Sequence, residues 1–132
     1  MKVLKDVFFL LVGLAFVGGS LYFVWNKPAG EVIRVGDKTI LVEIADTPEE
    51  RAQGLSGRAG LPAGHGVLFV FDSHGLYGFW MKEMNFSIDI IWLSEEFQVI
   101  DIARSVSPNT FPHVFYPPRP VKYVLETNPG EL

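Results

Sequence analysis

Seven stretches of strand length and a single helix start predict a mainly β domain in residues 31–132, sandwich-like or barrel-like, with one short helix. The chain of 132 residues is long enough for one domain of ordinary size. Ahead of the domain, residues 7–25 form a run without a single charge, which predicts one transmembrane helix.

The N-terminal segment, residues 1–26, is therefore expected to be a signal anchor. A helix over the apolar run would be about 28 Å long, close to the hydrocarbon thickness of a bilayer, which is roughly 30 Å. Lys2 and Lys5 precede the run, so we expect the N-terminus in the cytoplasm and the domain outside it. The alternative is a signal peptide with Gly18 and Ser20 at its cleavage site, which would leave a secreted domain.

A linker, residues 27–30, leads into the first two predicted strands, Glu31–Val35 and Lys38–Ala45, which flank a hairpin-like turn. The helix start follows as Thr47-Pro48-Glu49-Glu50, with Thr as N-cap, Pro at the first helical position and Glu at the third. Gly54 and Gly57 come soon after it, so this helix is expected to be short.

The second half of the domain is predicted to contain five strands and one long loop. The strands are expected at Val67–Phe71, Tyr77–Lys82, Phe86–Leu93, Phe97–Arg104 and Val121–Thr127. The loop, Ser107–Pro120, is rich in proline, which excludes central strand pairing. Its aromatic residues are expected either to fold over the domain as a lid or to face a partner.

Composition excludes several classes of function. The sequence contains no cysteine, which rules out disulfides, iron–sulfur clusters and thiol catalysis. Residues 27–132 have 9 basic and 14 acidic side chains, and this negative charge argues against a nucleic-acid partner. His65 and His74 lie at opposite ends of one predicted strand, roughly 20 Å apart, so we expect neither a metal site nor a cofactor.

Asp89 is the most informative single residue. Alternation in the strand Phe86–Leu93 leaves both faces largely apolar, so the carboxylate is expected to be shielded from water. A shielded carboxylate needs partners. Asp89 is therefore either a ligand contact or general base, or a structural ion pair with Lys82, Arg104 or Arg51.

The segment Phe79-Trp80-Met81-Lys82 combines aromatic rings with a cation. Alternation places Trp80 and Lys82 on one face of this predicted strand, where they resemble the lining of a sugar-binding or ligand-binding surface. The alternative is that these side chains belong to an ordinary core.

Six motifs in order resemble the DUF192 family, also called UPF0127, across residues 31–130. They are Ala45–Leu55 with Arg58, Gly66–Phe71, Phe79–Lys82, Ile88–Leu93, Tyr116-Pro117-Pro118 and Tyr123–Glu126. The resemblance implies a mainly β, jelly-roll-like domain, usually exported or anchored in prokaryotes, and it implies no reaction. Some relatives have cysteines in the loop that corresponds to Ser107–Tyr116. This chain has none, so a redox role of that loop is excluded. Relatives usually continue past Leu132 with a turn and a final strand, so we expect either a truncated C-terminus or an uncovered sheet edge.

The function predicted from these features is that of a membrane-anchored β domain which binds an envelope polymer or a membrane protein outside the cytoplasm. The candidate ligand-binding residues are Arg51, Arg58, Trp80, Lys82, Asp89 and Tyr116. One alternative is a hydrolase of envelope polysaccharide that uses Asp89 and a second carboxylate, with Asp101 and Glu126 available. The other is a structural subunit of a membrane complex.

Overall fold

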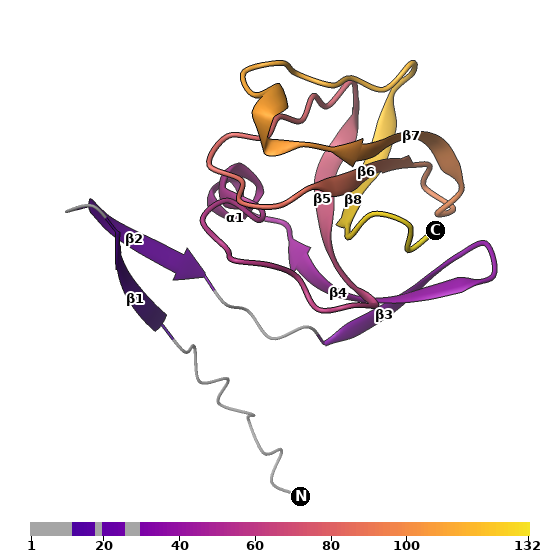
Figure 1. Ribbon diagram of the computed structural model, residues 1–132. Coiled ribbons are helices and arrows are strands. Elements are labelled where there is room, and N and C mark those ends of the chain that lie inside the picture. The colour runs from indigo at the N-terminus through magenta and orange to yellow at the C-terminus, as the bar shows by residue number, and fades with distance from the viewer. Residues whose placement is uncertain (1–11, 18–19, 26–29) are drawn as a thin grey trace, which may run out of the picture.

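The computed structural model describes residues 12–17, 20–25 and 30–132 (Figure 1). Strands β1 (Val12–Val17) and β2 (Ser20–Trp25) pair antiparallel as a sheet of their own. The expected transmembrane helix over residues 7–25 falls in part on residues outside this description. Within the described ranges, no helix combines the length and the hydropathy needed to cross a membrane. The membrane anchor therefore stays a prediction.

The domain is built on one mixed sheet of six strands, in the order β3-β4-β5-β8-β6-β7. All neighbouring strands are antiparallel except β4 and β5, which are parallel. The bounds are β3 (Glu31–Val35), β4 (Lys38–Ala45), β5 (His65–Gly75), β6 (Ile88–Leu93), β7 (Val99–Val106) and β8 (Val121–Thr127).

The parallel pair β4–β5 requires a crossover connection, and the short helix α1 (Pro48–Gln53) is part of it. The Thr47 side chain accepts a hydrogen bond from the Glu50 amide and caps the helix. Gly54 ends it with a φ of 49°, a left-handed conformation that favours glycine. Figure 1 shows α1 at one side of the sheet, and the loop that follows the 3₁₀ helix η1 (Pro108–Thr110) crosses above the strands.

The two faces of the sheet have separate cores. The face that α1 covers, here called the helix face, contains a buried cluster of Ala45, Leu55, Val67, Phe69, Met81, Met84, Ile88, Ile90, Trp92, Val106, Val121 and Val124. The other face, here called the strand face, contains Ile33, Val35, Ile40, Val42, Leu68, Ile91, Leu93 and Leu125. Strand alternation explains the division, because neighbours such as Ile90 and Ile91 point to opposite faces. Both faces are buried, as expected for central strands that read as continuous apolar runs.

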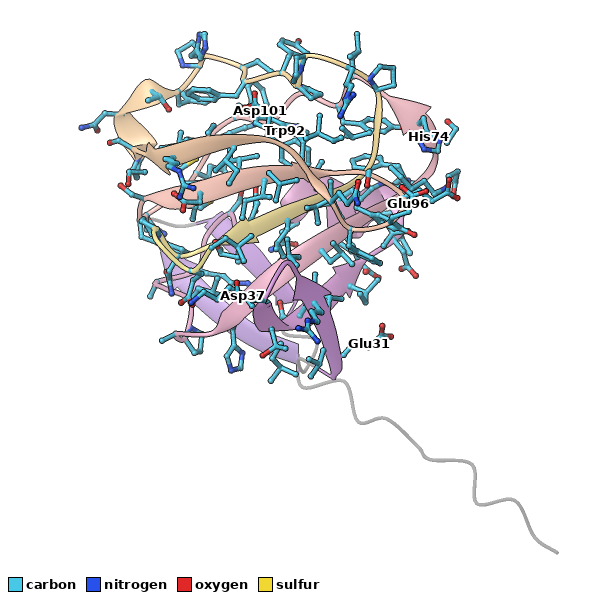
Figure 2. All side chains as sticks on the ribbon, turned by 90° about the vertical axis from the view of Figure 1, so that its right-hand side faces the viewer. Glu31, Asp37, His74, Trp92, Glu96 and Asp101 are labelled. Atoms are coloured by element: carbon cyan, nitrogen blue, oxygen red, sulfur yellow. The ribbon has the colours of Figure 1, made fainter. Side chains whose placement is uncertain are left out.

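The mainly β class with one short helix is confirmed, and the barrel is wrong. The sheet stays open, with β3 and β7 at its two edges. The predicted strand Tyr77–Lys82 is also wrong, because its only ladder contact is a single bridge between Phe79 and Phe115. Gly78 lies directly beneath the Tyr116 ring, so this segment packs as a loop over the helix face. Trp92, labelled in Figure 2, is buried and holds that loop through a hydrogen bond from its Nε1 to the Tyr77 carbonyl oxygen.

Candidate ligand-binding cavity

A cavity of about 290 Å³ opens on the helix face between α1, β5 and the loop that follows β5. This volume lies at the lower end of the roughly 300–1,000 Å³ typical of small-molecule sites. The lining residues are Arg51, Ala52, Gln53, Gly54, Leu55, Ser56, Phe69, Phe71, Tyr77, Gly78, Phe79, Trp80, Met84 and Glu126. The cavity therefore combines aromatic walls with one cation and one carboxyl group.

The aromatic walls hold one another in place. Phe71 stacks on Tyr77, with 3.5 Å between ring centroids, and Phe79 meets Phe69 edge-on at 4.9 Å. Phe79 is also fixed through its backbone, because its amide and carbonyl both bond with those of Phe115. These contacts preorganise one side of the cavity before any ligand is present.

Trp80 is an exposed aromatic residue in the cavity wall. Its side chain is 46% exposed, although a ring of this size is ordinarily buried in a core. The Phe111 ring lies 5.3 Å away, centroid to centroid, and Lys82 Nζ lies 5.7 Å from the centre of the Trp80 ring. An exposed ring held between an aromatic neighbour and a cation offers a stacking surface beside the cavity.

Arg51 on α1 is held rigidly at the cavity wall. Its Nη1 donates to the backbone oxygens of Asp46, at 2.7 Å, and Val70, at 3.0 Å. Its guanidinium carbon lies 5.4 Å from the centre of the Phe71 ring, a cation–π contact. These partners fix the position of the charge but do not neutralise it.

Glu126 on β8 is the buried carboxyl group of the cavity. In the sheet register it lies between Val67 of β5 and Ile90 of β6, and it is only 5% exposed. Its Oε2 has no hydrogen-bond partner among the described residues. Burial raises the pKa of Glu126 to about 8, although the nearby Arg58 cation acts to lower it. At pH 7 the group is therefore mostly a neutral acid that can donate a hydrogen bond.

Arg58 belongs to a smaller neighbouring cavity of about 20 Å³, lined also by Glu43 and Glu50. Its Nη2 lies 2.6 Å from Glu43 Oε2, and both side chains are mostly buried. The Arg58 charge is thus shared with a carboxylate on β4.

The structure brings some of the predicted site residues together. Arg51 and Trp80 line the large cavity, and Lys82 lies next to Trp80. Arg58 lines the smaller cavity. Tyr116 is exposed and lies over Gly78, at the outer edge of the same region.

Asp89 lies apart from this group and lines neither cavity. Its carboxylate is 1% exposed and accepts hydrogen bonds from two backbone amides, those of Ser105 at 2.7 Å and Gly130 at 2.9 Å. Arg104 Nη1 is 3.8 Å from its Oδ2, so Arg104 is the nearest of the three cations considered as partners. This arrangement joins β6 to β7 and to the C-terminal segment, which is a structural role.

Sequence reasoning named Glu126 only as an available second carboxylate for hydrolysis and left it out of the candidate ligand-binding residues. A signal was present, because Glu126 is an acidic residue in an otherwise apolar closing strand and belongs to the motif Tyr123–Glu126. The aromatic partners Phe71 and Tyr77 were missed for another reason. They are ordinary strand residues by pattern, and only the loop after β5 places Tyr77 against Phe71.

The histidines are dispersed over the domain. His74 lies beside the turn that contains Glu96 in Figure 2, with its Nε2 3.9 Å from Glu95 Oε2. His65 begins β5, and His113 packs against Phe115. In the part of the chain that the structure describes, no three acidic or histidine side chains are grouped so that they could hold a metal ion.

Comparison with known proteins identifies the family. Residues 31–132 match DUF192, described as "Uncharacterized ACR, COG1430". The chain belongs to the DUF192 family. The match covers the whole six-stranded sheet and both cavities, and no curated protein matches the chain.

Two solved structures are similar to this DUF192 chain. A protein of unknown function from Novosphingobium aromaticivorans has a TM-score of 0.66 and 29% identity, over 70% of this chain and 66% of its own. A protein from Sinorhizobium meliloti described as "a putative transcription regulator" has a TM-score of 0.68 and 29% identity, over 76% of this chain and 78% of its own. The chain thus spans just under two thirds of the first relative. Neither structure assigns a reaction to the cavity.

Proposed function

We propose that this DUF192 protein is a membrane-anchored domain that binds a small ring-shaped component of the cell envelope and does not transform it. The observation that supports this function is the aromatic cavity, with Glu126, whose Oε2 has no hydrogen-bond partner among the described residues, in its lining and the exposed Trp80 ring in its wall. Aromatic walls with a few fixed polar groups are the usual construction of a small-molecule site.

Binding is favoured over hydrolysis because, among the residues that the structure describes, Glu126 is the only carboxyl group in the lining of the cavity. Hydrolysis of a glycosidic bond usually needs two carboxyl groups about 5–10 Å apart. Asp89, the residue first considered for this chemistry, is occupied by backbone amides. Glu43 is paired with Arg58.

The location proposed for the domain rests on the sequence of residues 7–25. This run without charges follows Lys2 and Lys5, which favours an anchor with the domain on the outer side of the membrane. An envelope component would then be the ligand within reach. Carbonate extraction of membranes tests the anchor, and protease treatment of intact cells tests the side on which the domain lies.

A binding experiment tests the proposed function. The full chain in detergent micelles is titrated with a set of soluble fragments from envelope glycans, with calorimetry and tryptophan fluorescence as readouts. We expect saturable binding, and Trp80→Ala should weaken it at least tenfold in calorimetry, whereas Trp25 and Trp92 stay in the variant and give the fluorescence that does not depend on Trp80. Absence of binding to every fragment would overturn the proposal.

One observation supports a second candidate, hydrolysis with Glu126 as general acid. A carboxyl group with a pKa of about 8 holds its proton at pH 7, which is the form that a general acid needs. Chromatography of the same fragments after incubation distinguishes the two functions. Cleavage that Glu126→Gln abolishes would establish the enzyme and exclude a purely binding role.

A further inference from the structure

We propose that the cavity selects organic anions, namely small rings with one carboxylate, and that Arg51 and Glu126 together hold this carboxylate. The inference rests on the proposed binding function and specifies the chemical class of the ligand. Sugar acids and aromatic acids share this chemistry, and the experiment below separates them.

The first step is the unbalanced charge of Arg51. Its Nη1 bonds to two carbonyl oxygens, and its guanidinium lies over the Phe71 ring. No ion pair in the described part of the chain includes Arg51, and none of the hydrogen bonds there uses its Nε or Nη2. A planar guanidinium with free donors at a cavity wall matches the geometry of a carboxylate.

The second step is the state of Glu126. An ionised carboxylate in the cavity would repel an anion, but burial keeps this group protonated at neutral pH. As a neutral acid, it can donate its proton in a short, charge-assisted hydrogen bond to a ligand carboxylate. The unpartnered Oε2 is the atom with capacity for that bond.

The third step concerns the body of the ligand. Phe71 and Tyr77 form a stacked pair in the cavity wall, and Trp80 adds an exposed ring. Flat surfaces of this kind bind the faces of aromatic or sugar rings. The volume of about 290 Å³ restricts the occupant to a small molecule or to one terminal ring.

The charged groups near Glu126 set the pH dependence of binding. They are Glu43 from β4, Glu50 from α1 and Arg58 from the turn after α1, and all three line the smaller cavity beside it. Arg58 lies within 2.6 Å of Glu43, and the effect of burial outweighs the Arg58 charge, so Glu126 stays neutral below a pH of about 8. An anion should therefore bind best below pH 8 and more weakly above it, as Glu126 ionises.

Matched pairs of probes test the inference with the full chain in detergent micelles. Glucuronate is compared with glucose, and benzoate with benzyl alcohol, by calorimetry at pH 6 and pH 9. We expect at least one acid to bind tenfold more tightly than its neutral partner at pH 6. Its affinity should fall about tenfold at pH 9, where about a tenth of Glu126 stays protonated. The pair that shows this difference identifies the source as sugar acid or aromatic acid.

Three variants distinguish the effect of a changed charge on binding from the effect of a lost fold. Circular dichroism at both pH values checks that each variant is folded. Arg51→Gln should abolish the preference for the acid, and Arg51→Lys should retain part of it. Glu126→Gln keeps a neutral donor and should bind the acid equally at pH 6 and pH 9. The matched control is Arg34→Gln, which removes one positive charge from the exposed edge strand β3 and should leave the preference intact.

The outcomes distinguish this inference from the proposed function. Equal affinity for acid and neutral probes, or a preference that persists in Arg51→Gln, would overturn the inference and leave ligand binding intact. Binding of neutral envelope fragments alone would also overturn the inference and leave ligand binding intact. If no envelope fragment and no probe binds, the proposed function itself fails.

Discussion

Asp89 and Glu126 are two buried carboxyl groups in adjacent strands, and they differ in their hydrogen-bond partners. In the register of β6 and β8, Asp89 pairs with Thr127 and Glu126 pairs with Ile90, so the two acids are neighbours on opposite faces of the sheet. Asp89 accepts two backbone hydrogen bonds, whereas Glu126 Oε2 has no partner among the residues described.

The two sites show that buried carboxyl groups in one sheet can differ in their hydrogen-bond partners. A carboxylate whose oxygens face backbone amides is stabilised in its charged form, and its hydrogen bonds hold the surrounding segments together. A carboxyl group that faces an aromatic cavity loses its contacts with water and gains no hydrogen bonds in exchange, so its pKa rises and its oxygen keeps an unused capacity to form a hydrogen bond. Burial alone would have assigned both residues to the same class.

The largest expected loss of stability comes from removal of the Asp89 carboxylate. Asp89→Ala leaves the amides of Ser105 and Gly130 without their acceptor in a buried site. We expect a loss of about 3–5 kcal/mol in the free energy of unfolding. Urea denaturation measures it, with the exposed Asp101→Ala as control. A loss below about 1 kcal/mol would contradict the structural role.

Glu126→Gln should raise the free energy of unfolding at neutral pH, whereas Asp89→Ala should lower it. The acid ionises near pH 4.5 when unfolded and near 8 in the fold, so between these values the native state keeps a proton that the unfolded state has lost. The stability contributed by this site is therefore full below pH 4.5 and falls as the pH rises to 8. Since Gln cannot ionise, the variant should gain on the order of 3 kcal/mol at pH 7. Denaturation at pH 4.5, 7 and 9 measures the difference, and a gain that does not grow with pH would refute the assignment.

Gly54→Ala tests how closely the cavity wall is built around Glu126. A Cβ at this position would lie 3.0 Å from Phe69 Cζ and 3.6 Å from Glu126 Oε2, at a φ of +49°. We expect a loss of about 2 kcal/mol from strain and crowding, together with weaker ligand binding. Gly57→Ala is the matched control, because its φ is also positive but no atom lies within 4 Å of the new Cβ. Equal losses of stability in Gly54→Ala and Gly57→Ala would mean that the cavity wall moves to make room for the new Cβ at position 54.

Trp80→Ala should have the smallest effect on stability and still affect binding. The ring is 46% exposed, so its removal should cost less than about 1 kcal/mol. If the ring belongs to the ligand surface, affinity for the ring-shaped ligand should fall at least tenfold. Thermal denaturation and calorimetry on the same sample give both quantities. A large loss of stability with unchanged binding would make Trp80 a core residue instead.

Much of the domain follows from local sequence. The bounds of β3, β4 and β8 agree with those expected from the residue pattern, and Thr47 caps α1 as its position predicts. These features depend on alternation, capping and glycine turns within a few residues. Such interactions are already present in a short segment of chain, so the sequence alone determines them.

The candidate site depended on contacts between distant parts of the chain. Sequence reasoning proposed Arg51 and Trp80, which line the cavity, and Asp89, which lies outside it, because a strand pattern shows that an acid is buried and not what it faces. The parallel pairing of β4 with β5, and the packing of Tyr77–Lys82 as a loop, arise from long-range register and side-chain packing. These decide which buried carboxyl group meets backbone amides and which meets a cavity. Local sequence therefore accounts for β3, β4, β8 and α1 and for the family, whereas the position of the buried acid without a hydrogen-bond partner depends on the packing of distant segments.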